Sequence, residues 1–208
     1  TSLAHYLHNQ SVANEDTAIA TVSCASLTKE VLEPLMINDI RSIKSSDSET
    51  IQSIQTVFNS GGTLVLDEIA DLSIDVQPKM LHFLDKKVFR EGSTSTKAKP
   101  VRVIATTHQP ISELCSENKF RRDLYYRLKV FDVQISAIRN RLYDIDYIVQ
   151  EIVEDLRNEH GYQNVSLKED ALKKLRQHYW PGNMRELCNV LSNALVVSNK
   201  GEISAQDL

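Results

Sequence analysis

Two adjacent carboxylates, Asp67 and Glu68, follow an apolar run at residues 64–66. The run is typical of a buried strand, but two ionisable groups at its end cost desolvation free energy unless water or a cation compensates them. A strand that ends in Asp-Glu is also the Walker B pattern of nucleoside triphosphatases, in which Mg²⁺ and an attacking water are bound. This pattern is common by chance, so taken alone it favours a solvated strand end.

Arginines in two further motifs could act on phosphate groups. Arg121 and Arg127 lie six residues apart in FRRDLYYRL, and Arg185 lies in WPGNMREL. A planar, permanently charged guanidinium suits a site that must stabilise transferring phosphate charge. Arg185 would occupy the first turn of a helix, where a cation opposes the helix dipole. Taken alone, each motif is explained equally by exposed arginines on a helix surface.

Two histidines could bind a metal, since His5 and His8 are spaced i, i+3 on an expected helix. No further ligand lies near them in the sequence, so two surface histidines are the better interpretation. The three cysteines, Cys24, Cys115 and Cys188, have no metal-ligand or CxxC spacing, which favours reduced, buried thiols in a cytosolic protein.

The elements that must position these residues alternate along the first part of the chain. Apolar stretches at 18–23, 63–66 and 101–107 predict short buried strands. Helical spacing predicts helices at 28–36 and 76–87. The serine-rich part around 44–48 and the stretch 91–100 are typical of loops. Strands separated by helices predict an α/β layered domain.

The pattern becomes helical after about residue 137, where three helices with short connections predict a small bundle. The first follows i, i+3, i+4, i+7 spacing over 145–156, and Gly161 ends it. The second and third are expected to begin with capping boxes, and the third to end near 201. The expected capping residues are Ser166 with Glu169 and Asn183 with Glu186.

Composition limits the classes of protein that fit. The 208 residues are 41% hydrophobic, which is enough for a core, and the net charge is −4. That charge gives no basic excess for nucleic-acid binding by this chain. No apolar run approaches the roughly 18 residues of a membrane helix, and no signal peptide is visible. The first residue is Thr rather than Met, so we interpret the chain as a fragment, or as what remains after processing, of a longer cytoplasmic protein.

Taken together and in this order, the motifs resemble the central AAA+ ATPase domain of NtrC-type enhancer-binding proteins, the bacterial activators of sigma-54 RNA polymerase. The stretches VSCASL, GGTLVLDEIADL, RVIATTHQ, KFRRDLYYRL and WPGNMREL carry the resemblance. It implies an α/β three-layer sandwich with a parallel sheet at 1–138 and a helical lid at 139–208. The change of composition places the boundary between residues 135 and 143.

The resemblance implies roles for the residues expected at the nucleotide. Asp67 would hold Mg²⁺ through water and Glu68 would complete Walker B. Thr107 and His108 would form sensor I, which reads the γ-phosphate. Thr1 aligns with the last Ser/Thr of the phosphate-binding loop. The cofactor would be ATP or ADP with Mg²⁺.

The arginines would act between subunits and from the lid. Arg121 and Arg127 would form the pair that reaches a neighbouring subunit's nucleotide, and Arg185 would be sensor II. Within one subunit, Arg121 and Arg127 should be solvated. The resemblance also implies a homo-oligomer between a dimer and a hexameric ring.

The sequence departs from the family pattern in three places. It contains no GxxxxGK[ST] phosphate-binding loop, which removes the main anchor for nucleotide phosphates. The GAFTGA segment, which touches the sigma factor, is replaced by MINDIRSIKSSDSETIQSIQ. ISAIRNR at 135–141 replaces LPPLRER and loses both hinge prolines. We therefore expect no appreciable ATP hydrolysis by this chain and no remodelling of sigma-54.

These observations predict the AAA+ module of a DNA-binding transcription regulator that mediates oligomerisation and senses a nucleotide or an effector. The alternative is an active ATPase that remodels RNA polymerase holoenzyme. A receiver-like domain would precede the module and a helix-turn-helix that binds DNA would follow it, with no membrane contact. Family members without GAFTGA include VpsR-type biofilm regulators. Five arginines are compatible with cyclic di-GMP binding, although an oligomer interface explains them better: Arg121, Arg122, Arg127, Arg139 and Arg141.

Overall fold

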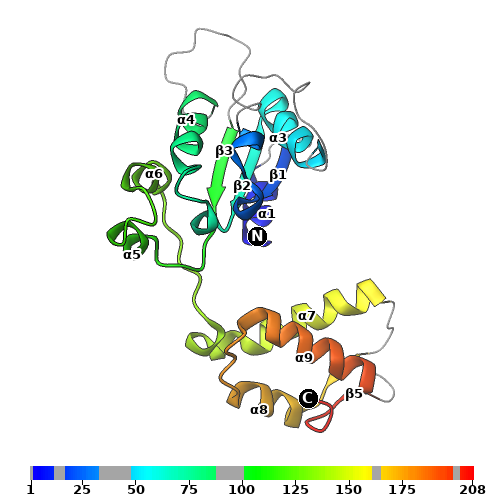
Figure 1. Cartoon of the computed structure of the whole chain (residues 1–208). Coiled ribbons are helices and arrows are strands. Elements are labelled where there is room, and N and C mark those ends of the chain that lie inside the picture. Colours follow the sequence, from blue (N-terminus) through cyan, green and yellow to red (C-terminus); the bar gives the residue numbers. More distant parts are fainter. Residues whose placement is uncertain (1, 12–16, 33–47, 88–100, 161–164, 199–201) are drawn as a thin grey trace. The chain divides into compact units, whose positions relative to one another are not determined.

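The computed structural model describes residues 2–11, 17–32, 48–87, 101–160, 165–198 and 202–208. The chain divides into two compact units, 1–132 and 133–208 (Figure 1). The division lies just before the interval 135–143 in which the change of composition places the boundary. Each unit is described by itself.

The first unit is built on a parallel sheet of three described strands in the order β1-β2-β3 (Figure 1). They are β1 (Ala18–Ser23), β2 (Gly62–Asp67) and β3 (Val101–Ala105). The predicted α/β architecture with a parallel sheet is confirmed. The central strand β2 is the most buried of the three, as its continuous apolar run predicts. β3 ends two residues before its predicted end.

Gly62 is required where β2 begins beside β1. It pairs with Ala18 and has φ of 141°, a conformation that side chains disfavour. A Cβ at this position would lie 1.9 Å from the carbonyl oxygen of Ala18. The second glycine of the GGTL stretch therefore allows the close approach that starts the parallel pairing.

Helices surround this sheet and complete the core. They are α1 (Ser2–Ser11), α3 (Ser48–Ser60), α4 (Gln77–Lys87), α5 (Ile111–Ser116) and α6 (Arg122–Leu128). α3 packs on β1 and β2, and α6 packs on α4. The core includes Met80, Phe83, Leu84, Phe120 and Leu124, each at most 2% exposed.

One helix was not predicted. α3 lies at the end of the polar segment that replaces GAFTGA, and its buried side chains Ile51, Ile54 and Val57 have helical spacing. The helix expected at 28–36 begins at residue 29 and is described to residue 32. The loop predictions at 44–47 and 91–100, and the helix end at Gly161, lie outside the described residues.

The described residues of the second unit form three α-helices and a short parallel pair of strands. The helices are α7 (Ile145–His160), α8 (Glu169–Gln177) and α9 (Asn183–Val197), and the strands are β4 (Ser166–Leu167) and β5 (Glu202–Ile203). Short 3-10 turns at Ile138–Asn140 and Leu142–Asp144 precede α7. The side chains of Ile138, Val149, Leu187 and Leu191 are fully buried in its core. The predicted helical bundle is confirmed.

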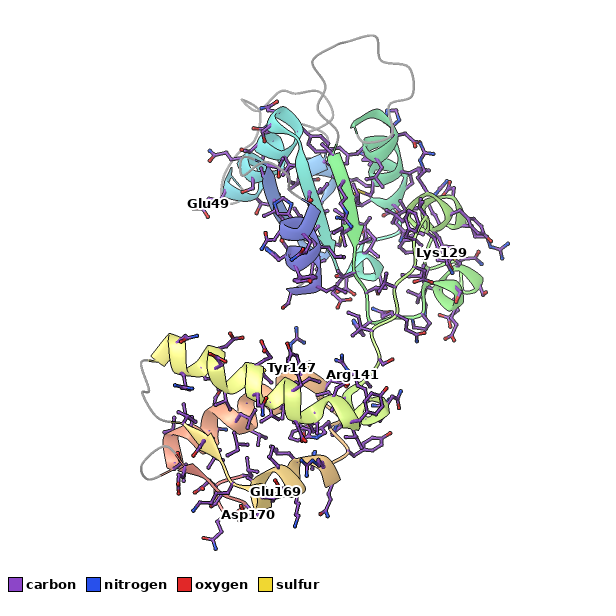
Figure 2. The ribbon with its side chains drawn as sticks, turned by 180° about the vertical axis from the view of Figure 1, so that it is seen from behind. Glu49, Lys129, Arg141, Tyr147, Glu169 and Asp170 are labelled. Atoms are coloured by element: carbon purple, nitrogen blue, oxygen red, sulfur yellow. The ribbon has the colours of Figure 1, made fainter. Side chains whose placement is uncertain are left out.

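The capping box predicted for α8 is wrong. Ser166 pairs with Glu202 in the small sheet and cannot cap, and Lys168 is the N-cap residue without a side-chain cap. The first turn instead carries Glu169 and Asp170, labelled in Figure 2. Their negative charge is favourable at a helix N-terminus.

The capping box predicted for α9 is half present. Glu186 Oε2 accepts a hydrogen bond from the backbone N–H of Gly182, the N-cap residue, at 2.8 Å. Asn183 has φ of 49° and does not cap the helix, because its Oδ1 accepts the backbone N–H of Ile138 at 3.0 Å. Within the described ranges, no helix is long and apolar enough to cross a bilayer.

Candidate functional site

The carboxylate pair lies at the C-terminal end of the central strand. Asp67 is the last residue of β2 and is half-buried. Glu68 follows with φ of 54° and ψ of 62°, a left-handed conformation that is uncommon for a residue with a side chain. A 3-10 turn, Ile69–Asp71, then carries the chain away from the sheet. Such local strain is found most often at functional sites, where the surrounding structure maintains it.

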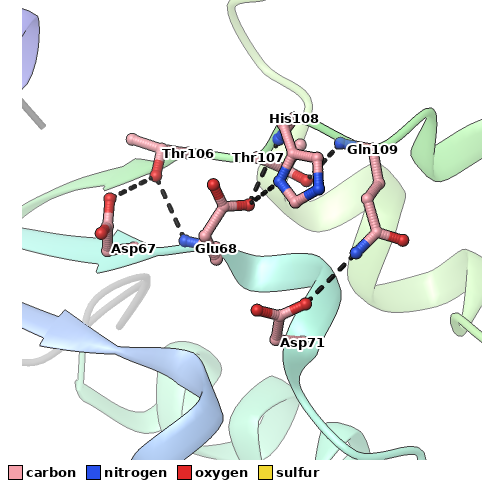
Figure 3. Close-up of polar contacts among 7 residues, drawn as sticks. All are labelled: Asp67, Glu68, Asp71, Thr106, Thr107, His108 and Gln109. Carbon is pink, nitrogen blue, oxygen red and sulfur yellow. Dashed lines mark hydrogen bonds and ion pairs between the residues drawn. The ribbon is translucent and has the colours of Figure 1, made fainter. Parts of the chain in front are cut away.

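Thr106 connects both carboxylate residues (Figure 3). Its hydroxyl donates to Asp67 Oδ1 at 2.7 Å and accepts the backbone N–H of Glu68 at 3.2 Å. Its backbone N–H donates to the Leu66 carbonyl and its own carbonyl accepts from Ile69, both at 2.9 Å. Sequence reasoning missed Thr106. The residue could have been found from the pairing of β3 with β2. Because Ala105 pairs with Leu66, the next residue, Thr106, lies opposite Asp67.

His108 holds the second carboxylate (Figure 3). Glu68 Oε2 accepts the backbone N–H of His108 at 3.2 Å and lies 2.8 Å from Nδ1 of the same residue. An ionised carboxylate only accepts, so Nδ1 carries the hydrogen in this contact. The side chains of His108 and Glu68 are 71% and 36% exposed, so a ligand from solvent could reach the pair.

Thr107 does not contact the carboxylate pair. It is exposed, and its hydroxyl oxygen accepts the backbone N–H of Gln109 at 3.1 Å. Gln109 Nε2 in turn donates to Asp71 Oδ1 at 3.2 Å. The loop after β3 is therefore bound to the turn after β2, with Thr106 and His108 rather than Thr107 on the carboxylates.

A buried thiol lies close to the carboxylates. Cys24, just after β1, is 1% exposed. Burial, together with the negative charge of Asp67, raises the pKa of this thiol to about 12. A thiol with so high a pKa is a poor nucleophile at neutral pH, so Cys24 is a packing residue.

The two arginines of the FRRDLYYRL stretch are not simply solvated, contrary to expectation. Arg121 donates to both carboxylate oxygens of Asp123, from Nε at 3.0 Å and Nη2 at 2.7 Å. Arg127 Nε lies 2.9 Å from Asp85 Oδ1 on α4. The hydrogen bond from Arg121 lowers the pKa of Asp123. Both arginines stay about two-fifths exposed, so the two ion pairs can exchange partners.

Arg127 also lines an open hollow of about 520 Å³. Leu81, Asp85, Asp123 and Tyr126 complete its lining. It lies on α4 and α6, whereas the carboxylate pair lies at the strand ends of β2. The chain thus carries two separate polar features within its first unit.

The other residues predicted to bind nucleotide or an effector are not part of the two polar features described above. Arg185 is exposed in the first turn of α9, in the second unit. Arg139 lies over the ring of Tyr179, 5.1 Å from its centroid, in a cation–π contact. Thr1 lies outside the described residues.

The two N-terminal histidines are not both on the surface. His8 is 6% exposed, and its Nδ1 lies 2.8 Å from the hydroxyl of Thr63 in β2. His5 Nε2 lies 3.2 Å from the hydroxyl of Thr21. Each histidine therefore ties α1 to a strand, and the buried position of His8 corrects the prediction of a surface residue.

The carboxylate pair fits Mg²⁺ in the way that nucleotide sites bind it. Mg²⁺ prefers oxygen ligands and is usually held by one or two carboxylates together with substrate phosphates and water. Asp67 supplies such an oxygen at an accessible edge of the sheet. In the part of the chain that the structure describes, no three His, Cys, Asp or Glu side chains form a metal cluster. Any Mg²⁺ here would therefore need phosphate oxygens as further ligands.

A parallel sheet with an Asp-Glu pair at its central strand end, followed by a helical unit, defines a member of the AAA+ class. Residues 1–134 match the family model of the Sigma-54 interaction domain, and residues 139–208 match that of the AAA+ ATPase lid domain. The chain belongs to the Sigma-54 interaction domain family, which confirms the resemblance to NtrC-type regulators.

The most similar curated proteins include bacterial transcription regulators, in agreement with this family. The chain is 32% identical over 208 residues to the alginate biosynthesis transcriptional regulatory protein AlgB of Pseudomonas aeruginosa, covering 99% of this chain and 46% of AlgB. It is 33% identical over 207 residues to the DNA-binding transcriptional regulator NtrC of Proteus hauseri, covering 99% and 43%. The chain therefore spans about half the length of these relatives.

Solved structures give the same fold. NtrX from Brucella abortus in complex with ATP aligns with a TM-score of 0.75 at 28% identity, over 100% of this chain and 47% of that one. Hsp104 aligns with a TM-score of 0.61 at 16% identity, over 94% and 37%, which supports the AAA+ fold alone.

Proposed function

We propose that this chain is the AAA+ module of a bacterial DNA-binding transcription regulator, and that ATP or ADP with Mg²⁺ binds at the C-terminal ends of β2 and β3. Bound nucleotide would control the assembly of several copies into an oligomer. The observation that carries this proposal is the convergence of Asp67, Glu68, Thr106 and His108 at one accessible edge of the sheet. The ATP-bound state of NtrX, a structural relative, supports it.

Each residue at this edge has a distinct part. Asp67 would accept a hydrogen bond from a water bound to Mg²⁺, and the hydroxyl of Thr106 orients its carboxylate. Glu68 would orient a water near the terminal phosphate, with His108 holding its carboxylate. Bound Mg²⁺ would supply the positive charge that offsets the carboxylates. Thr107 would approach the γ-phosphate from the same loop, and Thr1 would lie with the phosphates.

The arginines would act on nucleotides from other directions. In an isolated subunit, Arg121 and Arg127 are paired with Asp123 and Asp85. Exposed pairs of this kind are weak, so a phosphate arriving on a neighbouring subunit could replace either carboxylate. Arg185, exposed in the first turn of α9, is the candidate for sensor II.

The wider role follows from family membership and the sequence departures. The segment in place of GAFTGA lacks its glycines and its Phe-Thr pair, so we do not expect remodelling of sigma-54. The partners would be other copies of this protein, RNA polymerase holoenzyme, and DNA through a helix-turn-helix outside this chain, all in the cytoplasm. Cyclic di-GMP is a candidate effector on the exposed arginines.

Nucleotide binding tests the proposal. Fluorescence anisotropy of a fluorescent ATP derivative should show Mg²⁺-dependent binding to the full-length protein. Asp67→Asn keeps the size of the side chain but removes its charge, so it should abolish the Mg²⁺ dependence. Asp75→Asn, an exposed position outside the site, is the matched control. The proposal would be overturned if nucleotide binds equally well with and without Mg²⁺ and Asp67→Asn leaves the affinity unchanged.

The alternative is an active ATPase, and the completeness of the Asp67–Glu68 pair with its supporting contacts favours it. Steady-state phosphate release, measured on the full-length protein as well as on this chain, separates the two functions. We expect no appreciable release by this 208-residue chain, because it lacks the phosphate-binding loop. Release that disappears in Glu68→Gln would establish the ATPase instead.

Open-complex formation with sigma-54 holoenzyme tests the remodelling role. We expect the full-length protein to produce no ATP-dependent open complex on a sigma-54 promoter. An NtrC-type activator on its own promoter is the positive control. ATP-dependent opening would show that the segment in place of GAFTGA can still engage the sigma factor.

A further inference from the structure

Gln77 is a buried polar residue that the nucleotide site does not use. It is the first residue of α4 and is 0% exposed. Within the described ranges, only His8 and Thr63 share its class of buried polar side chain, and these two contact each other. A buried amide is costly unless its donors and acceptor are satisfied, so its partners indicate what it holds.

The amide of Gln77 joins three segments of the chain. Its Nε2 donates to the Leu72 carbonyl at 2.9 Å and to the Lys119 carbonyl at 3.1 Å. Its Oε1 accepts the backbone N–H of Arg121 at 2.8 Å. Leu72 follows the turn after Asp67 and Glu68, whereas Lys119 and Arg121 lead into α6. One side chain therefore links the carboxylate turn to the arginine segment.

The contact with Gln77 holds the backbone of Arg121 at the start of α6. Arg121 is the N-cap residue of α6, with an extended backbone and no side-chain cap. Its neighbour Phe120 is 2% exposed and Leu124 is fully buried, so the segment is held on the core around Arg121. A shift of the segment by one residue would leave the amide of Gln77 and its backbone partners unsatisfied in a dry interior.

We propose that Gln77 is a positioning residue for Arg121, setting through the Arg121 backbone where the guanidinium is presented to a neighbouring subunit. The Asp85–Arg127 ion pair adds a second link between α4 and α6. These two helices pack against each other (Figure 1). Glutamine suits the position because it is neutral, donates twice and accepts in one plane. The inference rests on the proposed role of Arg121 at the subunit interface.

The test is a double-mutant cycle on nucleotide-dependent assembly. Self-association of the full-length protein is measured by sedimentation velocity with Mg²⁺ and a slowly hydrolysed ATP analogue. The variants are Gln77→Met, Arg121→Ala and both together. Gln77→Met keeps the approximate volume and removes all three hydrogen bonds. Thr63→Val is the matched control, because it removes one buried hydrogen bond, to His8, away from α6.

We expect Gln77→Met to weaken assembly about tenfold, a coupling typical of groups within one hydrogen-bond network. Arg121→Ala should then add little in the Gln77→Met background. Thr63→Val should lower the melting temperature without weakening assembly. Two outcomes would show that Gln77 is merely structural. In one, the effects of Gln77→Met and Arg121→Ala on assembly are additive. In the other, Gln77→Met and Thr63→Val weaken assembly equally.

The single variants distinguish a failure of the positioning role of Gln77 from a failure of the proposed function of Arg121. If Arg121→Ala alone leaves assembly unchanged, the proposed interface fails and the positioning role fails with it. If Arg121→Ala weakens assembly but Gln77→Met does not, only the positioning role fails. Should the Met variant not fold, Gln77→Glu provides the second test. It keeps the acceptor for Arg121 but lacks the two amide donors, and it should weaken assembly as well.

Discussion

At the scale of single residues, the hydroxyl of Thr106 organises the carboxylate pair although it carries no charge. It orients Asp67 and also binds the backbone N–H of Glu68, whose left-handed conformation needs support. A hydrogen bond to a charged acceptor contributes more than one between neutral groups. The residue beside the ionisable pair is therefore as important to its geometry as the pair itself.

Thr106→Val should weaken Mg²⁺-dependent nucleotide binding about tenfold. It keeps the side-chain shape but removes both hydrogen bonds of the hydroxyl, of which the one to the Asp67 carboxylate is worth about 1.5 kcal/mol. Titration of Mg²⁺ at fixed ATP derivative, followed by anisotropy, measures the change. Thr56→Val is the control, since Thr56 is exposed on α3 and its hydroxyl donates to the Gln52 carbonyl of the same helix. An equal loss of Mg²⁺-dependent nucleotide affinity in the two variants would show that Thr106 has no specific role at the site.

A second prediction concerns pH and the lid. Arg176 donates to both oxygens of Asp146, at 2.9 and 2.6 Å, and this lowers the pKa of Asp146. A lowered folded-state pKa means that the pair stabilises the fold above the unfolded pKa of about 3.9. That stability is lost as the pH falls through the lowered value.

Arg176→Gln should therefore lower the melting temperature at pH 7, and the decrease should be smaller near pH 3, below the unfolded pKa of about 3.9. Lys173→Gln, an exposed charge on the same helix, should change neither value. Thermal melts of the three proteins at both pH values provide the measurement. A loss that is equally large at both pH values would show that Asp146 is not the partner that matters.

At the scale of elements, the parallel pairing of β1 with β2 brings the strand ends to one edge, and with them Ser23 beside Asp67. The pairing begins at Gly62, where the backbones approach too closely for any side chain. The geometry of the carboxylate pair therefore depends on a glycine at the opposite end of the same strand.

Gly62→Ala should destabilise the first unit by roughly 2–4 kcal/mol, from the left-handed backbone and from the clash with the Ala18 carbonyl. Urea unfolding monitored by circular dichroism measures the loss. Ser116→Ala, at the exposed end of α5, is the control. A midpoint near that of wild type would show that β1 and β2 do not meet as described.

At the scale of the whole chain, sequence predicted the elements best where one periodicity dominates. The strands at 18–23 and 63–66 and the helix of 145–156 follow their apolar patterns closely. α3 was missed because its polar face and the adjacent serines obscured the buried Ile51, Ile54 and Val57. Caps were the weakest prediction, since Ser166 and Asn183 are used by contacts distant in sequence.

The candidate site was predictable only in part for the same reason. Asp67, Glu68 and His108 are visible as motif residues, but Thr106 and Gln77 act through partners 38 to 44 positions away in the chain. Arg121 pairs with Asp123 only two residues away, but the pairing of Arg127 with Asp85 depends on the packing of α6 against α4. Such contacts follow from the fold rather than from local spacing.

The central claim is that nucleotide at the carboxylate pair of one subunit is met by Arg121 and Arg127 of another. Sedimentation velocity of the full-length protein, with and without Mg²⁺ and a slowly hydrolysed ATP analogue, tests it most directly. Wild type should assemble further when nucleotide is added, whereas Asp67→Asn and the double variant Arg121→Ala/Arg127→Ala should not. Thermal melts serve as the control, and they should barely change for the double variant because exposed ion pairs contribute little. Normal nucleotide-dependent assembly of the double variant, combined with a much lower melting temperature, would contradict the account and make the arginines structural.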